Sequence, residues 1–146
     1  MDTLDERIIE QLSEDGRRSY RDIARGLSVS LSTVSNHIKA LEKDGVIRGY
    51  SAVVDPEKLG YTLTAIINLK ISRGKLLEVQ RAIAKDPHVQ AVYDITGDWD
   101  SLVLAHFKER RDLNTFIKHV LTIPDVERTN TQLVLNIVKD ERLRHR

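Results

Sequence analysis

The sequence predicts an α+β protein, in which an N-terminal three-helix (winged) helix-turn-helix unit is joined by an arm to a C-terminal βαββαβ, ferredoxin-like unit. Three observations predict this fold. Apolar residues recur at helical spacing up to residue 45, they alternate at strand spacing after residue 61, and a strand–helix–strand pattern occurs twice. The changes of pattern divide the 146 residues into 1–48, an arm or hinge over 49–61, a sheet unit over 62–138 and a charged tail over 139–146.

The first two helices are marked by caps and by single apolar stripes. Asp2 or Thr3 can cap the first helix, and Gly16 is expected to end it. Ser19 precedes the second helix and resembles a capping box together with Asp22. The apolar stripes are Leu4, Ile8, Ile9 and Leu12 in the first helix and Ile23, Ala24 and Leu27 in the second. Helices this short are not stable alone, so we expect their stripes to pack together.

The third helix is apolar on one face and polar on the other. Ser30 is expected to cap it and Gly45 to close it. Its apolar stripe is Val34, Ile38 and Leu41, and its opposite face carries Ser32, Thr33, Ser35, Asn36, His37 and Lys39, followed by Lys43. Short hydrogen-bonding groups and a cation suit base edges in the DNA major groove, and a helix-turn-helix presents such a helix there. Sequence-specific binding of double-stranded DNA is therefore the leading hypothesis.

Positive charge is concentrated in the same region, although the formal net charge of the chain is only +1. Residues 16–48 contain seven Lys or Arg against three Asp or Glu, a local charge of +4, whereas the first helix is acidic. Such a local excess suits contact with DNA phosphates, and ordinary solvated faces are the alternative. The candidate phosphate contacts before and after the third helix are Arg17, Arg18, Arg21 and Arg48.

The arm is predicted to contain a strand and a turn. Residues that favour extended chain occur at Val46, Ile47, Tyr50, Val53 and Val54. Asp55 and Pro56 then start a turn, and Gly60 ends a short helical turn. We interpret this region as a wing or arm strand followed by a hinge.

An internal repeat defines the second unit. Leu76, Val79, Ile83, Pro87 and Val89 recur 37 residues later as Leu113, Phe116, Val120, Pro124 and Val126. Each copy reads as a helix, a turn and a strand, and the strand-rich runs 62–71 and 101–107 precede the two helices. Two strand–helix–strand units in series predict the βαββαβ arrangement.

The predicted sheet has apolar residues on both faces. In the first strand Ile67, Leu69 and Ile71 alternate with Ile66; in the last strand Leu133, Leu135 and Ile137 alternate with Val134 and Val138. Two helices cover only one face of a four-stranded sheet. We therefore expect a second copy of the chain on the other face, in a homodimer at least.

Three stretches resemble the Lrp/AsnC (leucine-responsive, feast/famine) family in the right order and spacing. LDERIIEQLSEDGRRSYRDIA is similar to its opening helices, LSVSLSTVSNHIKALEKDGVIRGYSAVVDPEKLG to its recognition helix and arm, and TGDWDSLV to its Gly-x-x-Asp effector turn. The resemblance implies a transcription regulator that binds pseudo-palindromic operators. It also implies dimers that assemble into tetramers or octamers, and a small-molecule effector, commonly an amino acid, bound between dimers.

The resemblance also implies an effector site. At its edge it places Gly97, Asp98, Trp99 and Asp100, with Thr129, Asn130 and Thr131 adding polar contacts. An ordinary hairpin turn is the alternative for the first four residues. The chain departs from the family at the centre of the recognition helix, where Asn36, His37 and Ala40 stand in place of basic residues. Because Asn prefers adenine edges, a less guanine-dependent operator is expected.

Other chemistry finds little support in the sequence. There are no cysteines, the five histidines have no metal-ligand spacing, and no phosphate-binding loop or nucleophile motif occurs, so we expect no cofactor, metal or catalytic residue. No apolar run approaches the ~20 residues of a membrane span, and we expect a cytoplasmic protein without membrane contact. Two alternatives remain open: an enzyme of the related sirohaem decarboxylase type, and an interaction module that does not bind DNA.

Overall fold

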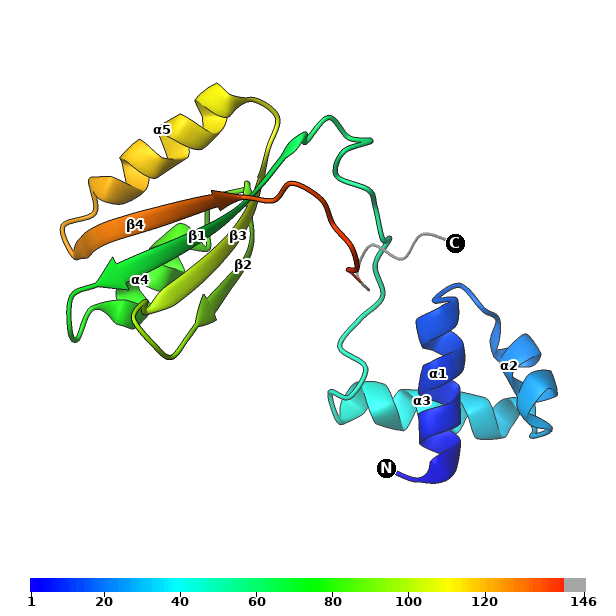
Figure 1. Ribbon diagram of the computed structural model, residues 1–146. Coiled ribbons are helices and arrows are strands. Elements are labelled where there is room, and N and C mark those ends of the chain that lie inside the picture. Colours follow the sequence, from blue (N-terminus) through cyan, green and yellow to red (C-terminus); the bar gives the residue numbers. More distant parts are fainter. Residues whose placement is uncertain (141–146) are drawn as a thin grey trace. The chain divides into compact units, whose positions relative to one another are not determined.

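The structure is a computed structural model that describes residues 1–140 of the chain (Figure 1). Of the predicted tail, residues 141–146 lie outside the described part. The chain divides into two compact units, Met1–Ala52 and Val53–Arg146, so the division falls inside the predicted arm. Within the described residues, no helix has the length and apolar character needed to cross a membrane.

The N-terminal unit consists of α1 (Thr3–Glu14), α2 (Tyr20–Leu27) and α3 (Leu31–Lys43). Their apolar stripes form one core, as the spacing predicted; its buried members are Ile8, Ile23, Ala24, Leu27, Val34 and Ile38. Leu4, Leu12 and Val29 pack against this core while partly exposed. The buried stripe of α3 therefore fixes which of its faces points outward.

The caps of α1 and α2 differ in part from the prediction. The reciprocal capping box forms at α1, where Asp2 accepts from the Asp5 N–H and Asp5 accepts from the Asp2 N–H. Ser19 does cap α2, but its hydroxyl donates to the Asp22 carboxylate, so the box is incomplete there. α1 ends directly before Gly16, as predicted, but extended Asp15 is its C-cap and Gly16 is not left-handed.

The C-terminal end of α3 follows the prediction. Gly45 is left-handed, with φ of +71°, and its N–H donates to the Glu42 carbonyl at 3.1 Å. The Val46 N–H reaches back to the Leu41 carbonyl at 2.9 Å. These two bonds satisfy carbonyls that the helix end leaves unpaired. They also set the direction in which the arm leaves α3, where the Tyr50 hydroxyl donates to Glu42 at 3.0 Å.

The strand expected between Val46 and Val54 is not formed. Residues 46–55 contain no strand, and Val46, Tyr50, Val53 and Val54 are all exposed. A strand requires a neighbour for its N–H and C=O groups, and none of the described strands pairs with this segment. The turn that follows was predicted correctly: the Tyr61 N–H donates to the Pro56 carbonyl at 2.9 Å, and Gly60 is left-handed.

The C-terminal unit confirms the βαββαβ prediction. Its elements are β1 (Leu63–Ile71), α4 (Leu76–Ile83), β2 (Val89–Asp94), β3 (Ser101–Phe107), α5 (Arg110–Leu121) and β4 (Val126–Leu133). The four strands form one antiparallel sheet in the order β2-β3-β1-β4 (Figure 1). The core lies between one face of the sheet and the two helices; its central members are Ala65, Ile67, Leu69, Val103, Ala105, Phe107, Phe116 and Val120.

The last strand is shorter than predicted. β4 ends at Leu133, and the Val134 N–H makes a final bond to the Thr64 carbonyl at 2.9 Å. Beyond it, Leu135 and Val138 are 98% and 93% exposed. The apolar alternation continues to Val138, but β1 begins at Leu63, which in this register lies opposite Leu135, so residues beyond Leu135 have no residue of β1 to pair with.

No helix among the described residues lies on the second face of the sheet, which we call the open face. On β1 and β3 it is made by Thr64, Ile66, Asn68, Lys70, Leu102, Leu104 and His106, all half-buried. His106 bridges neighbouring strands there: its Nδ1 lies 2.9 Å from the Thr64 hydroxyl, and its Nε2 contacts the Gln90 amide. The open face therefore mixes an apolar centre with hydrogen-bonded polar groups.

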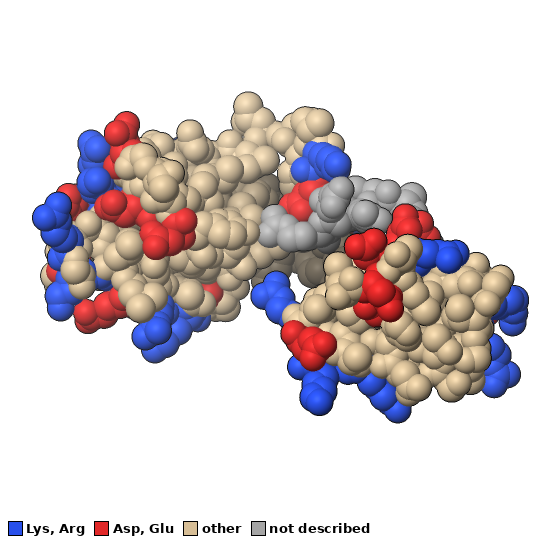
Figure 2. All heavy atoms as spheres, turned by 90° about the horizontal axis from the view of Figure 1, so that it is seen from below, with Lys and Arg blue, Asp and Glu red and all other residues tan. Residues whose placement is uncertain are grey.

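Charged side chains are dispersed over the surface of each unit. On the face shown in Figure 2, Lys and Arg form several separate groups with Asp and Glu between them. The local excess of positive charge counted in the sequence therefore does not merge into one continuous patch on that face.

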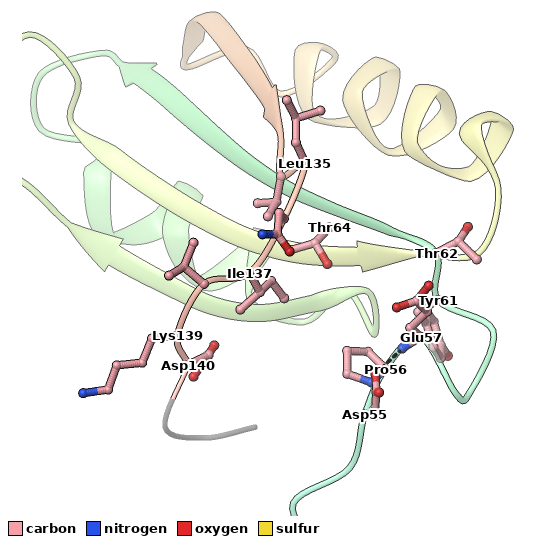
Figure 3. A pocket seen from close by; sticks show the side chains of 13 residues that line it. Asp55, Pro56, Glu57, Tyr61, Thr62, Thr64, Leu135, Ile137, Lys139 and Asp140 are labelled. Carbon is pink, nitrogen blue, oxygen red and sulfur yellow. Dashed lines mark hydrogen bonds between the residues drawn. The ribbon is translucent and has the colours of Figure 1, made fainter. Parts of the chain in front are cut away.

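A groove of about 590 Å³ lies within the C-terminal unit (Figure 3). One wall is formed by the segment from Asp55 to Thr64 and the other by residues Val134 to Asp140. The groove is at the Thr64 end of β1, whereas the turn 97–100 contacts the opposite end, near Lys70. It is therefore separate from the predicted effector turn.

Candidate functional site

The N-terminal end of α3 is organised by three hydroxyl groups. Ser30 accepts from the Thr33 N–H at 3.1 Å, and its Oγ lies 3.1 Å from Ser32 Oγ and 2.7 Å from Thr33 Oγ1. Ser32 and Thr33, predicted as base readers, are thus also part of the helix cap. The cap fixes the start of α3 relative to the turn, because it satisfies donors that the helix leaves unpaired.

The outward face of α3 offers an amide and two ammonium groups. Asn36, Lys39 and Lys43 are exposed, and their side chains make no hydrogen bond or ion pair with any other described residue. Ser35 is half-buried beside them. Since Val34 and Ile38 are fully buried on the opposite side, this face cannot rotate inward without opening the core.

His37 is turned away from that face. Its Nδ1 lies 2.7 Å from the Asp5 carboxylate on α1, and both side chains are largely covered. The pKa of Asp5 is held below its usual value. The main cause is the side-chain hydrogen bond with His37, and the next is the hydrogen bond from the Asp2 backbone N–H. A DNA contact by His37 stays a prediction. In the structure the His37 side chain has another role, because it joins α3 to α1 through Asp5.

Asp2, Asp5 and His37 place three metal-ligand types together, with their ligand atoms within 4.8 Å of one another. No motif in the sequence indicated this group, because 32 residues separate Asp5 from His37. Its oxygens and nitrogen already serve the capping box of α1 and the Asp5–His37 bond. The cluster is accounted for by helix packing.

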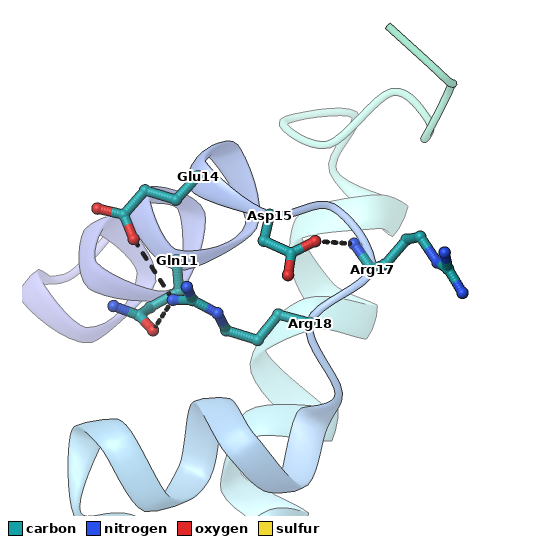
Figure 4. A network of polar contacts seen from close by, with 5 residues as sticks. All are labelled: Gln11, Glu14, Asp15, Arg17 and Arg18. Carbon is teal, nitrogen blue, oxygen red and sulfur yellow. Dashed lines mark hydrogen bonds and ion pairs between the residues drawn. The ribbon is translucent and has the colours of Figure 1, made fainter. Parts of the chain in front are cut away.

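The predicted phosphate contacts before and on α2 differ in how accessible their guanidinium groups are, and Figure 4 shows two of them, Arg17 and Arg18. Arg18 is held against α1: its guanidinium contacts the Gln11 amide and lies 3.4 Å from Glu14. Arg17 is exposed and its side chain points away, while its backbone N–H donates to Asp15 at 3.0 Å. Arg21 is exposed at the start of α2. Arg17 and Arg21 are therefore the accessible guanidinium groups of the three.

In the C-terminal unit, the turn 97–100 is fastened to the end of β1. Gly97 has φ of +103°, a conformation in which other residues are strained. Asp100 donates its N–H to the Leu69 carbonyl at 2.9 Å, and one of its carboxylate oxygens accepts the Ile71 N–H at 2.8 Å. The second oxygen lies 3.7 Å from Lys70 Nζ. The carboxylate that the motif assigns to an effector also holds the turn in place.

Two cations that sequence reasoning missed lie beside this turn. Lys70 Nζ donates to the Asp98 carbonyl at 3.2 Å, and the Arg128 guanidinium stacks on the Trp99 ring, 4.8 Å from its centroid. Lys70 and Arg128 are paired across β1 and β4. No sequence motif marked them, because they come close only through the register of the sheet. By contrast, Asp98 is exposed and its carboxylate makes no ion pair with another described residue.

The three polar residues of β4 are not brought to one place. Asn130 pairs with Asn68 and therefore lies on the open face. Thr129 and Thr131 pair with Leu69 and Ile67, whose side chains face the helices. A single site on one face of the sheet can use Asn130 or the two threonines, but not all three.

Both units match known family models. Residues 1–48 match the model described as winged helix-turn-helix DNA-binding, and residues 64–143 match the model described as Lrp/AsnC ligand binding domain. An uncharacterized HTH-type transcriptional regulator of Pyrococcus furiosus is 49% identical over 141 residues, 97% of this chain and 95% of that protein. HTH-type transcriptional regulator FL11 of Pyrococcus horikoshii is 38% identical over 140 residues, 96% of this chain and 93% of FL11.

Solved structures share the whole architecture. One is a transcriptional regulator of Neisseria meningitidis, determined as a complex with L-Met. It has a TM-score of 0.89 at 27% identity, and the match spans 96% of this chain and 93% of the Neisseria chain. AsnC of E. coli also has a TM-score of 0.89, with coverages of 96% and 95%; at 24% identity that likeness shows the fold alone.

Proposed function

This chain belongs to the Lrp/AsnC family of transcriptional regulators, and we propose that it reads operator DNA with the outward face of α3 and binds an amino-acid effector beside the turn 97–100. As a member of the family, it is a DNA-binding transcription regulator with a separate ligand-binding domain. The proposal concerns the residues that carry these two functions, the class of effector and the assembly.

The observation that carries the DNA-binding part is the exposed face of α3. Asn36 presents an amide of the kind that pairs bidentately with an adenine edge, and Lys39 and Lys43 present cations that suit phosphates. Arg17 and Arg21 add accessible guanidinium groups before and on α2. Base contacts specify a sequence, whereas phosphate contacts position the protein on any DNA.

The experiment that tests this part is selection from a random-sequence duplex library with the full-length protein. We expect an enriched, pseudo-palindromic sequence for the wild type. A variant with Asn36→Ala should enrich a degenerate version of it. The matched control is Glu42→Gln, at a neighbouring exposed position on the same helix, which keeps an acceptor for the Tyr50 hydroxyl and should leave the selected sequence unchanged. Equal enrichment of all sequences by the wild type would contradict the proposal.

Operator symmetry requires a symmetric protein, and the open face supports a homodimer. Its apolar centre is formed by Ile66, Leu102 and Leu104, and no helix of residues 1–140 covers them. Burying this face against the same face of a second copy would give an isologous, two-fold interface. We propose further assembly of such dimers into tetramers or octamers, in the cytoplasm where the operators are accessible.

The effector part rests on the turn 97–100 and on the ligand-binding family model. The L-Met complex of the Neisseria relative supports an amino acid as the class of ligand. In this chain the left-handed Gly97 leaves room for a ligand carboxylate to approach backbone N–H groups, since no side chain stands there. Asp98 offers an exposed carboxylate to the ligand's ammonium, and Asp100 keeps the turn in shape.

The effector proposal is tested by calorimetric titration of the twenty amino acids into the wild type and into Asp98→Asn. We expect at least one amino acid to bind the wild type and to bind Asp98→Asn more weakly. Glu127→Gln, an exposed acid on β4, is the control. Binding of none of the twenty would contradict the amino-acid effector and would leave the DNA-binding proposal intact.

A further inference from the structure

Leu31 is an apolar side chain at the end of the helix that a helix-turn-helix presents to base edges. It is the first residue of α3 and is 45% exposed. The core of the N-terminal unit buries Val34 and Ile38 of the same helix, but Leu31 is neither among the buried members of that core nor among the partly exposed residues packed against it. Packing of the unit therefore leaves nearly half of Leu31 exposed to solvent.

The groups around Leu31 are polar and already engaged with one another. Ser30 caps the helix, and its hydroxyl contacts those of Ser32 and Thr33. The first turn of α3 thus presents leucine methyl groups amid hydroxyls that are held in the cap. In the major groove of DNA, the apolar feature that distinguishes one base from the others is the C5-methyl group of thymine.

We propose that Leu31 contacts the C5-methyl group of a thymine and thereby specifies a T·A base pair in each half-site. The inference rests on the proposed reading of DNA by α3 and adds a residue that works by apolar contact, where Asn36 works by hydrogen bonding. Burying one methyl group changes a binding constant about fourfold, which sets the expected discrimination in each half-site.

The test begins with the sequence selected by the full-length wild-type protein. Each thymine of that duplex is replaced in turn, symmetrically in both half-sites, by deoxyuridine, which removes the methyl group and keeps the hydrogen-bonding edge. We expect one position at which the replacement weakens wild-type binding about fourfold per half-site. Leu31→Ala should bind the thymine and deoxyuridine duplexes equally, and Leu31→Met should keep a preference for thymine.

Leu121→Ala is the matched control, because Leu121 is also an exposed leucine, at 49%, but lies on α5 in the other unit. It should retain the full preference of the wild type. If Leu31→Ala binds no duplex, Leu31→Met decides: a retained thymine preference supports the proposal and a lost one overturns it.

Two results would overturn the inference while leaving the proposed function standing. One is equal binding of the wild type to every deoxyuridine duplex, and the other is an unchanged thymine preference in Leu31→Ala. A selection in which the wild type enriches no sequence would instead overturn the reading of DNA by α3, and this inference with it.

Discussion

At the scale of single residues, Asp100 shows that a residue of a ligand-binding motif can be occupied within its own chain. Its carboxylate accepts the Ile71 N–H at 2.8 Å and lies near the Lys70 ammonium. The neighbouring Asp98 carboxylate is exposed. The two acids of one short motif should therefore respond differently to removal. The loss of Asp100 should destabilise the turn, and the loss of Asp98 should weaken ligand binding.

We predict that Asp100→Ala lowers the free energy of unfolding by about 1–3 kcal/mol, because the partly buried Ile71 N–H loses its acceptor. Asp100→Asn keeps an amide oxygen for that N–H and should recover most of the loss. Chemical denaturation of the two variants and of Asp98→Asn measures the difference. Wild-type stability in Asp100→Ala would show that the bond does not hold the turn.

Asn36 and Lys39 are both proposed to contact DNA, but their substitution should change DNA binding in different ways. We predict that Asn36→Ala costs about 1–3 kcal/mol on the selected operator and little on random DNA, because an amide pairs with a base edge. Lys39→Ala should weaken binding to all DNA and reduce the slope of log K against log salt by about one unit. Salt-dependent binding isotherms on both duplexes measure this. Equal losses on operator and random DNA would exclude Asn36 as a base reader.

At the scale of elements, the helix ends and the contacts between helices set the geometry of the helix-turn-helix unit, α1 to α3. Ser28, between α2 and α3, is a non-glycine residue with φ of +56°, and Gly45 closes α3 at φ of +71°. Ser28 thus occupies a conformation that favours glycine, whereas Gly45 is a glycine where one is needed. The two positions make opposite predictions.

Ser28→Gly should raise the free energy of unfolding by about 1 kcal/mol, because the left-handed conformation costs other residues about that much. Gly45→Ala should lower it by about the same amount for the same reason. A Cβ at Gly45 meets no atom within 4 Å, so the cost of Gly45→Ala lies in the backbone conformation and not in packing. Denaturation of both variants provides the measurement, and a loss of stability in Ser28→Gly would contradict the argument.

The bond between Asp5 on α1 and His37 on α3 should make stability depend on acid pH. The pKa of Asp5 is lowered in the folded state, first by His37 and then by the Asp2 backbone. The stability from this shift is present above the unfolded pKa of 3.8 and is lost as pH falls through the lower folded value. We predict a smaller acid-induced loss in Asp5→Asn than in the wild type, measured by thermal unfolding below about pH 5. Glu6→Gln, an exposed acid on α1, is the control.

At the scale of the whole molecule, several apolar segments have no partner among residues 1–140. One example is the centre of the open face. The others are exposed apolar residues of the arm, such as Val53 and Val54, and of the segment after β4, such as Leu135 and Val138. Exposed apolar surface of this extent is typical of an association site. The strands expected in these segments are not formed within the described residues, and the homodimer that we propose would offer them neighbours.

We predict that the wild type is at least a dimer in light scattering at micromolar concentration, and that Leu104→Arg shifts it toward monomer by placing a charge in the centre of the open face. Leu77→Arg, at an exposed position on α4, should remain associated. A two-fold dimer also predicts operator half-sites separated by about 34 Å, one turn of DNA, or a multiple of it. A monomeric wild type would contradict this assembly.

Much of the fold was predictable because its signals are local. The stripes of α1 to α3, the Ser30 cap, the left-handed Gly45 and the alternation in β1 and β3 each depend on residues a few positions apart. The 37-residue repeat located both strand–helix–strand units. The errors fell where a local pattern has no neighbouring strand. Residues that favour extended chain occur between Val46 and Val54, and apolar alternation continues to Val138, but a strand also requires a partner.

The amino-acid sequence determined the order of elements, the two-unit organisation and the polar face of α3, since periodicity and capping act between near neighbours in the chain. Only the tertiary structure decided which side chains of those faces are available. It turned His37 toward Asp5, held Arg18 against Gln11, and brought Lys70 and Arg128 to the turn that Asp100 fastens. These contacts join residues up to tens of positions apart, and they depend on how helices pack and on the register of the sheet, which no local pattern specifies.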